Sequence, residues 1–540
     1  MAVVTRSWSV RATVEPGTEP PFDRLHDPVT ADLVAGGPVS RERVLSRWSD
    51  DDALRRLAEK RAPLPAPLAG ALREYHRRLG AGPASLRSLE RLAAGEAVCT
   101  IAGQQPAPLG GPLYSLHKTA AAVGLARRVE ARTGVPCVAV FWNHTEDSDF
   151  AEIHSVTVGD AALGLHELTF TDGAHTEGGL IGSIPSAFNA AIAEAALGHW
   201  DGLPGREALA EVLRGVAACA RDLGEAQAAL LLRLFADQGL VVVDPRLPEF
   251  RAAARPLVDR YLAGAESLAG AARRAGAALE VRLGRRPLAD AALESFVFAV
   301  RDGTRHKITV AEARALGPGA PLVPSVALRP VVQDAVLPTV AMACGPGELA
   351  YLAQLREVFE GLGVPAACPV PRLGATWLPP AAIGLIEASA AEPWRVVATT
   401  DQVLRGLAEA RVPAALRDDL ERLRGDVADR LRSFADRAIG LDPSLPQMVE
   451  SARGKMDYQM ARLEEGLVSK ARHRLDREHP EWLRLRYYLL PGDRLQERRL
   501  ASLEPLAYRG PAVVHDLCDL AESHAALLER GTHAHYLLEL

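Results

Sequence analysis

Cysteine is scarce in this chain, and the few cysteines lie far apart. Only six occur among 540 residues, with no CxxC pair and no short Cys/His spacing. Structural zinc sites need such clusters, so we expect no structural zinc and assign no metal ligands. The scatter also gives no disulfide framework, which favours reduced thiols in the cytoplasm. The six residues are Cys99, Cys137, Cys219, Cys344, Cys368 and Cys518.

The chain also lacks a large excess of charge and long apolar runs. Its formal net charge is −6, which gives no electrostatic case for binding nucleic acid. The apolar stretches are too short or too broken to span a bilayer. The opening MAVVTRSWSVRATVEPGTEP has no uninterrupted apolar core, as a signal peptide would. We therefore expect a cytoplasmic globular protein with no nucleic-acid or membrane partner.

Three familiar catalytic motifs are missing. The chain has neither a Walker A loop with GKS or GKT nor a GxGxxG dinucleotide fingerprint. It has no serine nucleophile elbow and no Ser-His-Asp order, which disfavours hydrolytic acyl transfer.

What the chain does have is a β-α-β pattern from residue 97 to residue 142. Val98, Cys99 and Ile101 predict a short buried strand, and residues 138–141 predict a second one. Between them apolar residues recur at helical spacing from Leu113 to Val129. A crossover of this length is typical of parallel strands and predicts an α/β fold.

The remaining pattern alternates in the same way. We expect short strands and turns inserted in the sheet at 155–185, helices at 205–237 and a buried strand at 240–243. Residues 320–345 look apolar and extended. A glycine loop at Gly345 should open another amphipathic helix.

Residues 400–480 change character. Apolar residues step by three and four in two long charged stretches, separated by the turn sequence GLDPSLP. This predicts an antiparallel helical hairpin whose apolar stripes need a second surface, and a second copy of the chain would supply one. We therefore expect a homodimer through this arm. The predicted domains are a core at 1–395, the arm at 396–485 and a C-terminal segment at 486–540 that returns to the core.

The first candidate site is the loop after the first strand. It contains glycines that let a ligand approach the backbone, and it leads into a helix N-terminus that favours anions. Tyr114, His117 and Lys118 share one face of that helix, so Lys118 could meet a phosphate and His117 an oxyanion. The alternative is a tight turn with a solvated lysine. The loop residues are Gly103, Gln104, Gln105, Gly110, Gly111 and Pro112.

The second candidate site follows the second strand, which ends near Trp142. Four acids lie within seven residues, with His144 just before them. Acids at the carboxyl end of a parallel strand can hold a ribose, an amine or a metal-bound nucleotide. The alternative is a solvated acidic loop that caps a helix. The acids are Glu146, Asp147, Asp149 and Glu152.

The third candidate site combines Arg329 and Gln333 with the Gly345 loop. Arg329 precedes a proline, which predicts an extended backbone, and its guanidinium could clamp a carboxylate. The alternative is a buried structural arginine. Asp334, Gly347, Glu348 and Tyr351 complete this group.

These segments together resemble the bacillithiol biosynthesis cysteine-adding enzymes. The chain reads AGQQPAPLGGPLYSLHK, PCVAVFWNHTEDSDFAEI, LRPVVQDAVLPT, GPGELAYLAQL and LQER in the family order, from end to end. Ser148 stands where the family has histidine, and His144 stands where it has a small residue. Ala102 replaces the usual threonine before GQQ.

The resemblance implies a Rossmann-like, nucleotidyltransferase-like core with inserted segments and a coiled-coil arm that dimerises. It implies the last step of bacillithiol synthesis, in which cysteine is joined to glucosaminyl malate. By analogy with other cysteine ligases, ATP or another nucleotide with Mg²⁺ would activate the cysteine carboxyl as an acyl adenylate.

The chemistry of the residues then suggests their roles. Gln104, Gly110, Gly111, His117 and Lys118 would handle phosphates. Glu146, Asp147 and Asp149 would hold the amine or the ribose, and Arg329 a carboxylate. The catalytic candidates are His117, Lys118, Glu146 and Asp147; the binding candidates are Gly103, Gln104, Gln105, Gly110, Gly111, Pro112, Tyr114, Trp142, His144, Asp149, Arg329, Gln333 and Tyr351.

Two other functions stay open at this point. One is a different nucleotidyl-transferring or ATP-dependent ligase on the same core. The other is a non-catalytic, nucleotide-binding assembly protein that uses the arm, an interpretation that Ser148 favours and the intact GQQ, GGPLY and HK segments disfavour.

Overall fold

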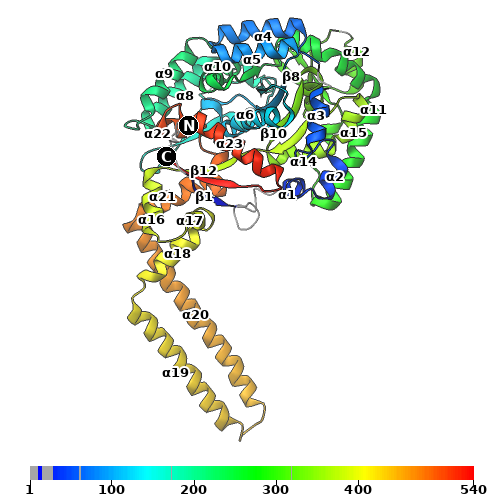
Figure 1. Cartoon of the computed structure of the whole chain (residues 1–540). Helices are drawn as coiled ribbons and strands as arrows, with labels where there is room; N and C mark the ends of the chain where they lie inside the picture. The colour runs from blue at the N-terminus through cyan, green and yellow to red at the C-terminus, as the bar shows by residue number, and fades with distance from the viewer. Residues whose placement is uncertain (1–9, 15–27, 60–61, 172, 318) are drawn as a thin grey trace. The chain divides into compact units, whose positions relative to one another are not determined.

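The computed structural model describes residues 10–14, 28–59, 62–171, 173–317 and 319–540 (Figure 1). They divide into two compact units, Met1–Pro380 with Pro491–Leu540, and Ala381–Leu490. The divisions predicted from the sequence lie at residues 395 and 485. The opening segment that we judged a poor signal peptide lies mostly outside the described residues.

The first unit is built on a five-stranded parallel sheet. Its strand order is β11-β10-β2-β3-β6, and every pair of neighbours is parallel. This confirms the predicted α/β, Rossmann-like class. The strands are β2 Val98–Gln104, β3 Cys137–Asn143, β6 Val241–Val243, β10 Thr339–Cys344 and β11 Cys368–Pro371.

The predicted β-α-β unit forms as expected. The connecting helix α6 spans Leu113–Thr133 and ends at Gly134, which adopts a left-handed backbone with φ of 73°. Gly103 pairs with Trp142, so β2 and β3 end at the same edge of the sheet. The polar residues that follow both strands therefore lie at the same edge of the sheet.

The period of two along the strands divides their side chains between two helical layers. Cys99 and Ile101 join the large core with α4, α5, α11 and α13–α15. On the other face, the Thr100 hydroxyl donates to the carbonyl of Ala122 in α6 over 2.7 Å. A Cβ on Gly124 of α6 would lie 2.5 Å from the backbone of Ala521, so α6 and α23 pack with their backbones in close approach.

The helices of the first unit account for most of its remaining length. They are α1 Pro28–Ala35, α2 Pro38–Arg43, α3 Asp51–Glu59, α4 Ala66–Arg78, α5 Pro83–Ala94, α6 Leu113–Thr133, α7 Phe150–Ile153, α8 Ser186–His199, α9 Arg206–Ala217, α10 Leu223–Leu234, α11 Pro248–Leu283, α12 Val310–Ala315, α13 Arg329–Val336, α14 Pro346–Gln354, α15 Arg356–Leu362, α22 Glu504–Arg509 and α23 Val513–Glu529.

The inserted strands form sheets of their own, which corrects the prediction that strands at 155–185 join the main sheet. β4 (Ser155–Gly159) and β5 (Leu165–Thr169) pair with each other as an antiparallel hairpin. β7 (Val297–Arg301), β8 (Thr304–Lys307) and β9 (Leu322–Pro324) form a separate antiparallel sheet. The two strands of a short hairpin pair with each other, so the sequence contained no signal for which sheet the hairpin would join.

The C-terminal strand also pairs within the first unit. β13 (His535–Glu539) lies between β12 (Gly374–Leu378), to which it is parallel, and β1 (Val10–Val14), to which it is antiparallel. The C-terminal segment is therefore part of the unit that holds the parallel sheet.

The prediction that residues 320–345 are extended is wrong in its middle part. Arg329–Val336 form helix α13, with Pro330 in its first turn. Proline is tolerated there because the first helical N–H groups have no partner within the helix. The backbone N–H of Arg329 donates to the carbonyl of Ser325 over 2.8 Å.

The second unit is helical throughout. Its two long helices, α19 and α20, lie side by side, and Arg424 Nε of α19 lies 2.9 Å from Asp457 Oδ1 of α20 (Figure 1). This confirms the predicted coiled-coil hairpin. The helices are α16 Pro380–Ala388, α17 Pro393–Ala398, α18 Thr400–Arg411, α19 Ala414–Ala438, α20 Leu445–Glu478 and α21 Pro480–Leu489.

None of the six cysteines forms a disulfide bond, and four of them are buried. Among the helices of the described residues, none combines the length and the apolar character that a membrane span requires.

Candidate active site

The strand order of the parallel sheet reverses between β2 and β10. From β2 the chain proceeds to β3 and β6 on one side, and it returns later to place β10 and β11 on the other side. Ligands of open α/β sheets bind outside the carboxyl ends of the strands at such a switch point. Gln104 ends β2 there, and Gly345 follows β10.

Lys118 occupies this switch point. It lies in the second turn of α6 and is 5% exposed. Its ammonium donates to the carbonyl of Gly103 over 3.0 Å and to Gln104 Oε1 over 3.2 Å. It also forms an ion pair with Glu348 Oε2 over 2.6 Å. An ammonium has three donors, so Lys118 ties β2 to the start of α14.

Glu348 receives a second contact at the same oxygen. The backbone N–H of Gly345 donates to Glu348 Oε2 over 2.7 Å, as part of the N-terminal cap of α14. A carboxylate oxygen therefore lies at a helix N-terminus and against a lysine. Helix N-termini and lysines both favour anions, so this position also suits a ligand phosphate.

A chain of hydrogen bonds extends from Lys118 to the acidic loop. Gln104 Nε2 donates to the Tyr114 hydroxyl over 3.1 Å and to Gln105 Oε1 over 3.0 Å. Gln105 Nε2 donates in turn to Glu152 Oε2 over 2.7 Å and to Asp147 Oδ2 over 3.2 Å. Burial, aided by the charge of Glu152, raises the pKa of Tyr114 to about 12, so this phenol keeps its proton.

The acidic loop divides its carboxylates between different surroundings. Asp147 forms an ion pair with Arg305 over 3.2 Å and also accepts a hydrogen bond from the Gln105 amide. Glu146 instead accepts two hydrogen bonds from Arg251, and burial raises its pKa to about 7 against that attraction. Asp149 is exposed and caps helix α7 through the N–H of Glu152.

His144 lies directly over the end of β2. A Cβ on Gly103 would lie 2.6 Å from His144 Nε2, so only glycine leaves room for this ring. Burial lowers the pKa of His144 well below its usual value, and the positive charges of Arg329 and Lys118 lower it further. The ring is therefore neutral at physiological pH and lies in the field of two cations.

Arg329 belongs to the same cluster although its backbone is helical rather than extended. The neighbouring Tyr351, Asp147 and Glu348 raise the pKa of its guanidinium against the opposing effect of burial. We call Gln104, Tyr114, Lys118, His144, Asp147, Arg329, Glu348 and Tyr351 the switch-point cluster.

The glycines at 110 and 111 do not form the open anion cradle that the sequence predicted. The N–H of Gly110 donates to the Ala107 carbonyl and that of Gly111 to the Pro108 carbonyl. The first helical N–H of α6, at Leu113, donates to the carbonyl of Leu500 over 2.7 Å. The C-terminal segment therefore covers this helix N-terminus.

Ser502 completes the cover over the same loop. Its N–H donates to the Gly111 carbonyl over 2.8 Å, and its hydroxyl donates to the carbonyl of Pro112 over 2.7 Å. Gly110 and Gly111 have φ values of 80° and 79°, which explains the glycines as requirements of the turn.

His117 has a structural environment, which argues against its predicted catalytic contact. The ring is 0% exposed, and Trp377 Nε1 donates to its Nε2 over 3.0 Å. An indole N–H can only donate, so the ring proton lies on Nδ1 and is given to Glu497 Oε2 over 3.1 Å. Both ring nitrogens are therefore used within the protein.

Two other predicted binding residues are also part of the packing. Trp142 is 2% exposed and meets Phe250 edge to face in the large core. Gln333 is buried and donates to Asp334 Oδ1 over 3.1 Å, and Asp334 in turn holds the N–H of Ala367. Both side chains stabilise the fold around the switch-point cluster.

Four charged residues near this site were not predicted from the sequence. Arg305 reaches Asp147 from the inserted β8, and Arg251 reaches Glu146 from α11. Arg372 holds Glu497 through two hydrogen bonds of 2.9 and 2.6 Å, and its guanidinium lies 5.6 Å from the Tyr114 ring centre. Only Glu497 had a signal, because it lies in the LQER segment.

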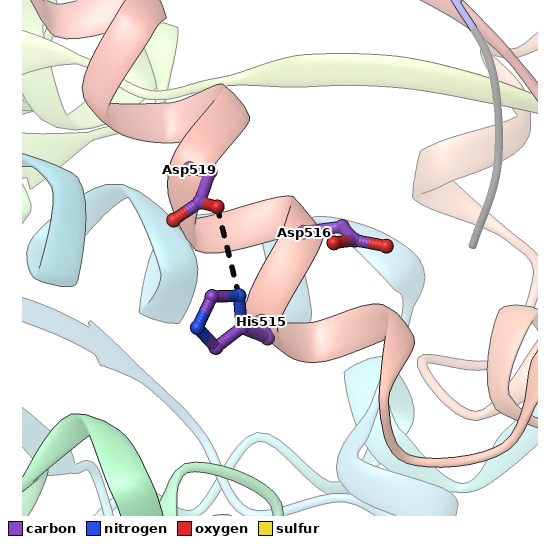
Figure 2. Close-up of side chains that lie close together, drawn as sticks. All are labelled: His515, Asp516 and Asp519. Carbon is purple, nitrogen blue, oxygen red and sulfur yellow. Dashed lines mark ion pairs between the residues drawn. The ribbon is translucent and has the colours of Figure 1, made fainter. Parts of the chain in front are cut away.

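A separate cluster of potential metal ligands lies on α23. His515, Asp516 and Asp519 offer ligand atoms within 4.8 Å of one another (Figure 2). Asp519 already pairs with Arg127 over 2.7 Å, and His515 Nδ1 lies 3.5 Å from its other oxygen. The arginine supplies the charge that a cation would bring, so we assign no metal site here.

Comparison with known families covers nearly the whole chain. The family described as bacillithiol biosynthesis BshC, N-terminal Rossmann-like domain, matches residues 44–316 and 318–373. The family described as bacillithiol biosynthesis BshC, C-terminal coiled-coil domain, matches residues 375–528.

Individual relatives agree with this result. A protein of Koribacter versatilis named "Putative cysteine ligase BshC" is 31% identical over 472 residues, which are 84% of this chain and 87% of that protein. A protein of the same name from Geobacillus thermodenitrificans is 29% identical and covers 87% of this chain and 91% of its own length. The architecture, the order of the motifs and these similarities agree: the chain belongs to the bacillithiol biosynthesis BshC family.

Proposed function

We propose that this protein is a ligase that joins the carboxyl group of L-cysteine to the amine of glucosaminyl malate, forming the amide bond of bacillithiol. Family membership and the names of the relatives support a cysteine ligase. The glucosaminyl malate substrate, the use of ATP and a cytoplasmic location are our extensions of that result.

The observation that carries the proposal is the ion pair of Lys118 and Glu348 at the topological switch point. A bound phosphate would replace the Glu348 carboxylate between Lys118 and the N–H of Gly345. Each of those groups would then donate to an anion, as each does now. These two donors support a nucleotide phosphate at this position.

Amide formation from a carboxylate and an amine needs activation in water. In the proposed reaction a carboxylate oxygen of cysteine attacks the α-phosphorus of ATP and pyrophosphate leaves. The amine then attacks the carbonyl carbon of the acyl adenylate, loses a proton and displaces AMP. Lys118 would stabilise the charge that develops on the phosphate oxygens.

The neighbouring residues suit the remaining tasks. Arg329, which lies beside Tyr351, would bind a carboxylate. The carboxylates of Asp147 and Glu152 share the Gln105 amide, and their oxygens are the ligand type that Mg²⁺ prefers. Mg²⁺ would neutralise phosphate charge there.

The test is a product assay on the purified chain. L-cysteine, glucosaminyl malate, ATP and Mg²⁺ should yield bacillithiol and AMP, both measured by mass spectrometry, and omission of ATP should abolish the product. If ATP raises the melting temperature but no nucleotide supports product formation, the chain is a nucleotide-binding assembly protein. Turnover with other acids or amines alone would indicate a different ligase.

We also propose that the second unit binds a second copy of this chain. None of the residues of α19 is buried, and only Val449 and Leu475 are buried in α20. Apolar side chains remain exposed along both helices, which a two-fold related hairpin would cover. The exposed residues are Leu416, Leu423, Phe434, Met448, Met456, Tyr458 and Leu463.

A further inference from the structure

A cavity of about 360 Å³ adjoins the acidic loop at Glu146. Its walls are the first turns of α11 and the segment that forms β9, with Glu146 between them. Ala254 and Val258 come from α11, and Leu322 comes from β9. Ligand cavities in proteins begin at about 300 Å³, so this one suits a small metabolite.

The charged part of the cavity contains the ion pair of Glu146 and Arg251, in which each side chain keeps one polar atom for a further contact. Arg251 donates from Nε and Nη2 to the same oxygen, Glu146 Oε1, over 3.0 and 2.7 Å. Within the described part of the chain, Glu146 Oε2 and Arg251 Nη1 make no hydrogen bond. The pair thus offers one further acceptor and one further donor, although the Glu146 side chain is only 9% exposed.

The composition of the walls limits what can bind. Besides Glu146, Arg251 and Arg255, the described residues that line the cavity are proline, alanine, glycine, valine, leucine and phenylalanine. None of them carries a hydroxyl or an amide side chain. A sugar would leave several hydroxyls without partners there, which is unfavourable.

The cavity adjoins the switch-point cluster through a shared wall. Glu146 and Asp147 are consecutive, and Arg305 contacts both through Nη1 to the Glu146 carbonyl and Nη2 to the Asp147 carboxylate. A molecule in the cavity therefore lies one loop away from the residues around Lys118.

We propose that this cavity binds the amino acid substrate, with its ammonium at Glu146 Oε2 and its small side chain against the apolar wall. This orientation leaves the carboxylate free for activation. The assignment of cysteine as this amino acid rests on the function proposed above.

The test measures binding of L-cysteine to the full-length chain under reducing conditions by saturation-transfer NMR and calorimetry. Glu146→Gln keeps the shape of the side chain and removes its charge, so L-cysteine should bind at least tenfold more weakly. Ala254→Met fills the cavity and should have the same effect without changing charge. Glu249→Gln removes a carboxylate from the same helix outside the cavity lining and should change nothing.

Kinetics separate this proposal from the proposed function. In Glu146→Gln the KM for cysteine should rise at least tenfold while the KM for glucosaminyl malate stays constant. Unchanged cysteine binding in both cavity variants, no binding to the parent chain, or binding of glucosaminyl malate in its place would overturn the cavity assignment. A parent chain that binds L-cysteine here but makes no bacillithiol would instead refute the function.

Discussion

Lys118 Nζ and Glu348 Oε2 lie 2.6 Å apart, at the place where the strand order of the parallel sheet reverses. One residue belongs to the helix after β2 and the other to the helix after β10. The ion pair therefore joins the two halves of the Rossmann-like sheet at the position where this architecture binds ligands. Three of the five predictions below concern residues in or around this part of the sheet.

Removal of the Lys118 charge should strongly reduce ligation. Lys118→Met keeps most of the buried stem, so we expect a folded protein whose turnover falls about a hundredfold or more. The product assay with ATP measures this, with circular dichroism as the check on folding. Lys307→Met, which breaks the exposed pair with Glu294, is the control. Equal turnover in Lys118→Met and the control would show that Lys118 has no catalytic contact.

Replacement of His117 should affect folding first. His117→Ala opens a cavity, removes the acceptor of the Trp377 N–H and deprives Glu497 of one donor. We expect a loss of about 2–4 kcal/mol in the free energy of unfolding, measured with urea. The exposed His154→Ala should leave stability unchanged. A normal urea midpoint combined with lost turnover would restore the catalytic role predicted from sequence.

His144 should take the place of the histidine that Ser148 replaces. The charges of Arg329 and Lys118 both lower the pKa of His144, whereas the Ser148 N–H donates to the Asp147 carboxylate over 2.7 Å in the same loop. His144→Ala should lower turnover about tenfold or more, and Ser148→His in that background should restore part of it. The idea fails if His144→Ala has normal turnover while Ser148→His alone exceeds the parent.

The protein should lose stability in mild acid because buried histidines must gain a proton on unfolding. Burial lowers the pKa of His76 from 6.5 to about 4, and its ring holds Leu72 and Val242. The unfolded chain binds the proton first, so the stabilisation is present above pH 6.5 and is lost as the pH falls toward 4.

For His76 alone this linkage costs about 2 kcal/mol at pH 5. Urea unfolding at pH 7.5 and pH 5 measures it. The pH-dependent difference should shrink in His76→Leu and stay constant when the exposed His306 is replaced by leucine. An equal difference in all three proteins would contradict the linkage.

The arm should hold a homodimer. Leu423 and Leu463 are 47% and 57% exposed, and Leu423→Glu with Leu463→Glu places charge on both apolar stripes. Light scattering should then report half the parental mass while the purified chain keeps its melting temperature shift with ATP. Ser433→Glu with Ser451→Glu adds the same charge at exposed polar positions and should stay dimeric. A parent that is monomeric at micromolar concentration would disprove the dimer.

The acidic loop shows how far local sequence could predict the site. Four acids after a buried strand correctly indicated carboxylates at the carboxyl edge of the sheet. The sequence did not show that these carboxylates would pair with different arginines, because Arg251 and Arg305 approach from an unrelated helix and an inserted hairpin. Each arginine fixes the direction of one carboxylate, and neither has a sequence spacing that links it to the loop.

His117 shows the same limit more clearly. Its position beside Lys118 was readable from sequence, but its partner Glu497 lies 380 residues away in the chain. The glycine turn at 110 and 111 is likewise covered by residues 500–502, which no local pattern connects with it.

The sequence by itself determined the β-α-β unit, the helical hairpin, the family and the edge of the sheet that carries the polar residues. These follow from side-chain periodicity and turn chemistry, which act over a few residues. Only the tertiary structure decided which of those polar groups make hydrogen bonds and ion pairs within the protein. A buried donor or acceptor must be satisfied by whatever the fold brings within about 3 Å, and long-range packing alone sets that neighbour.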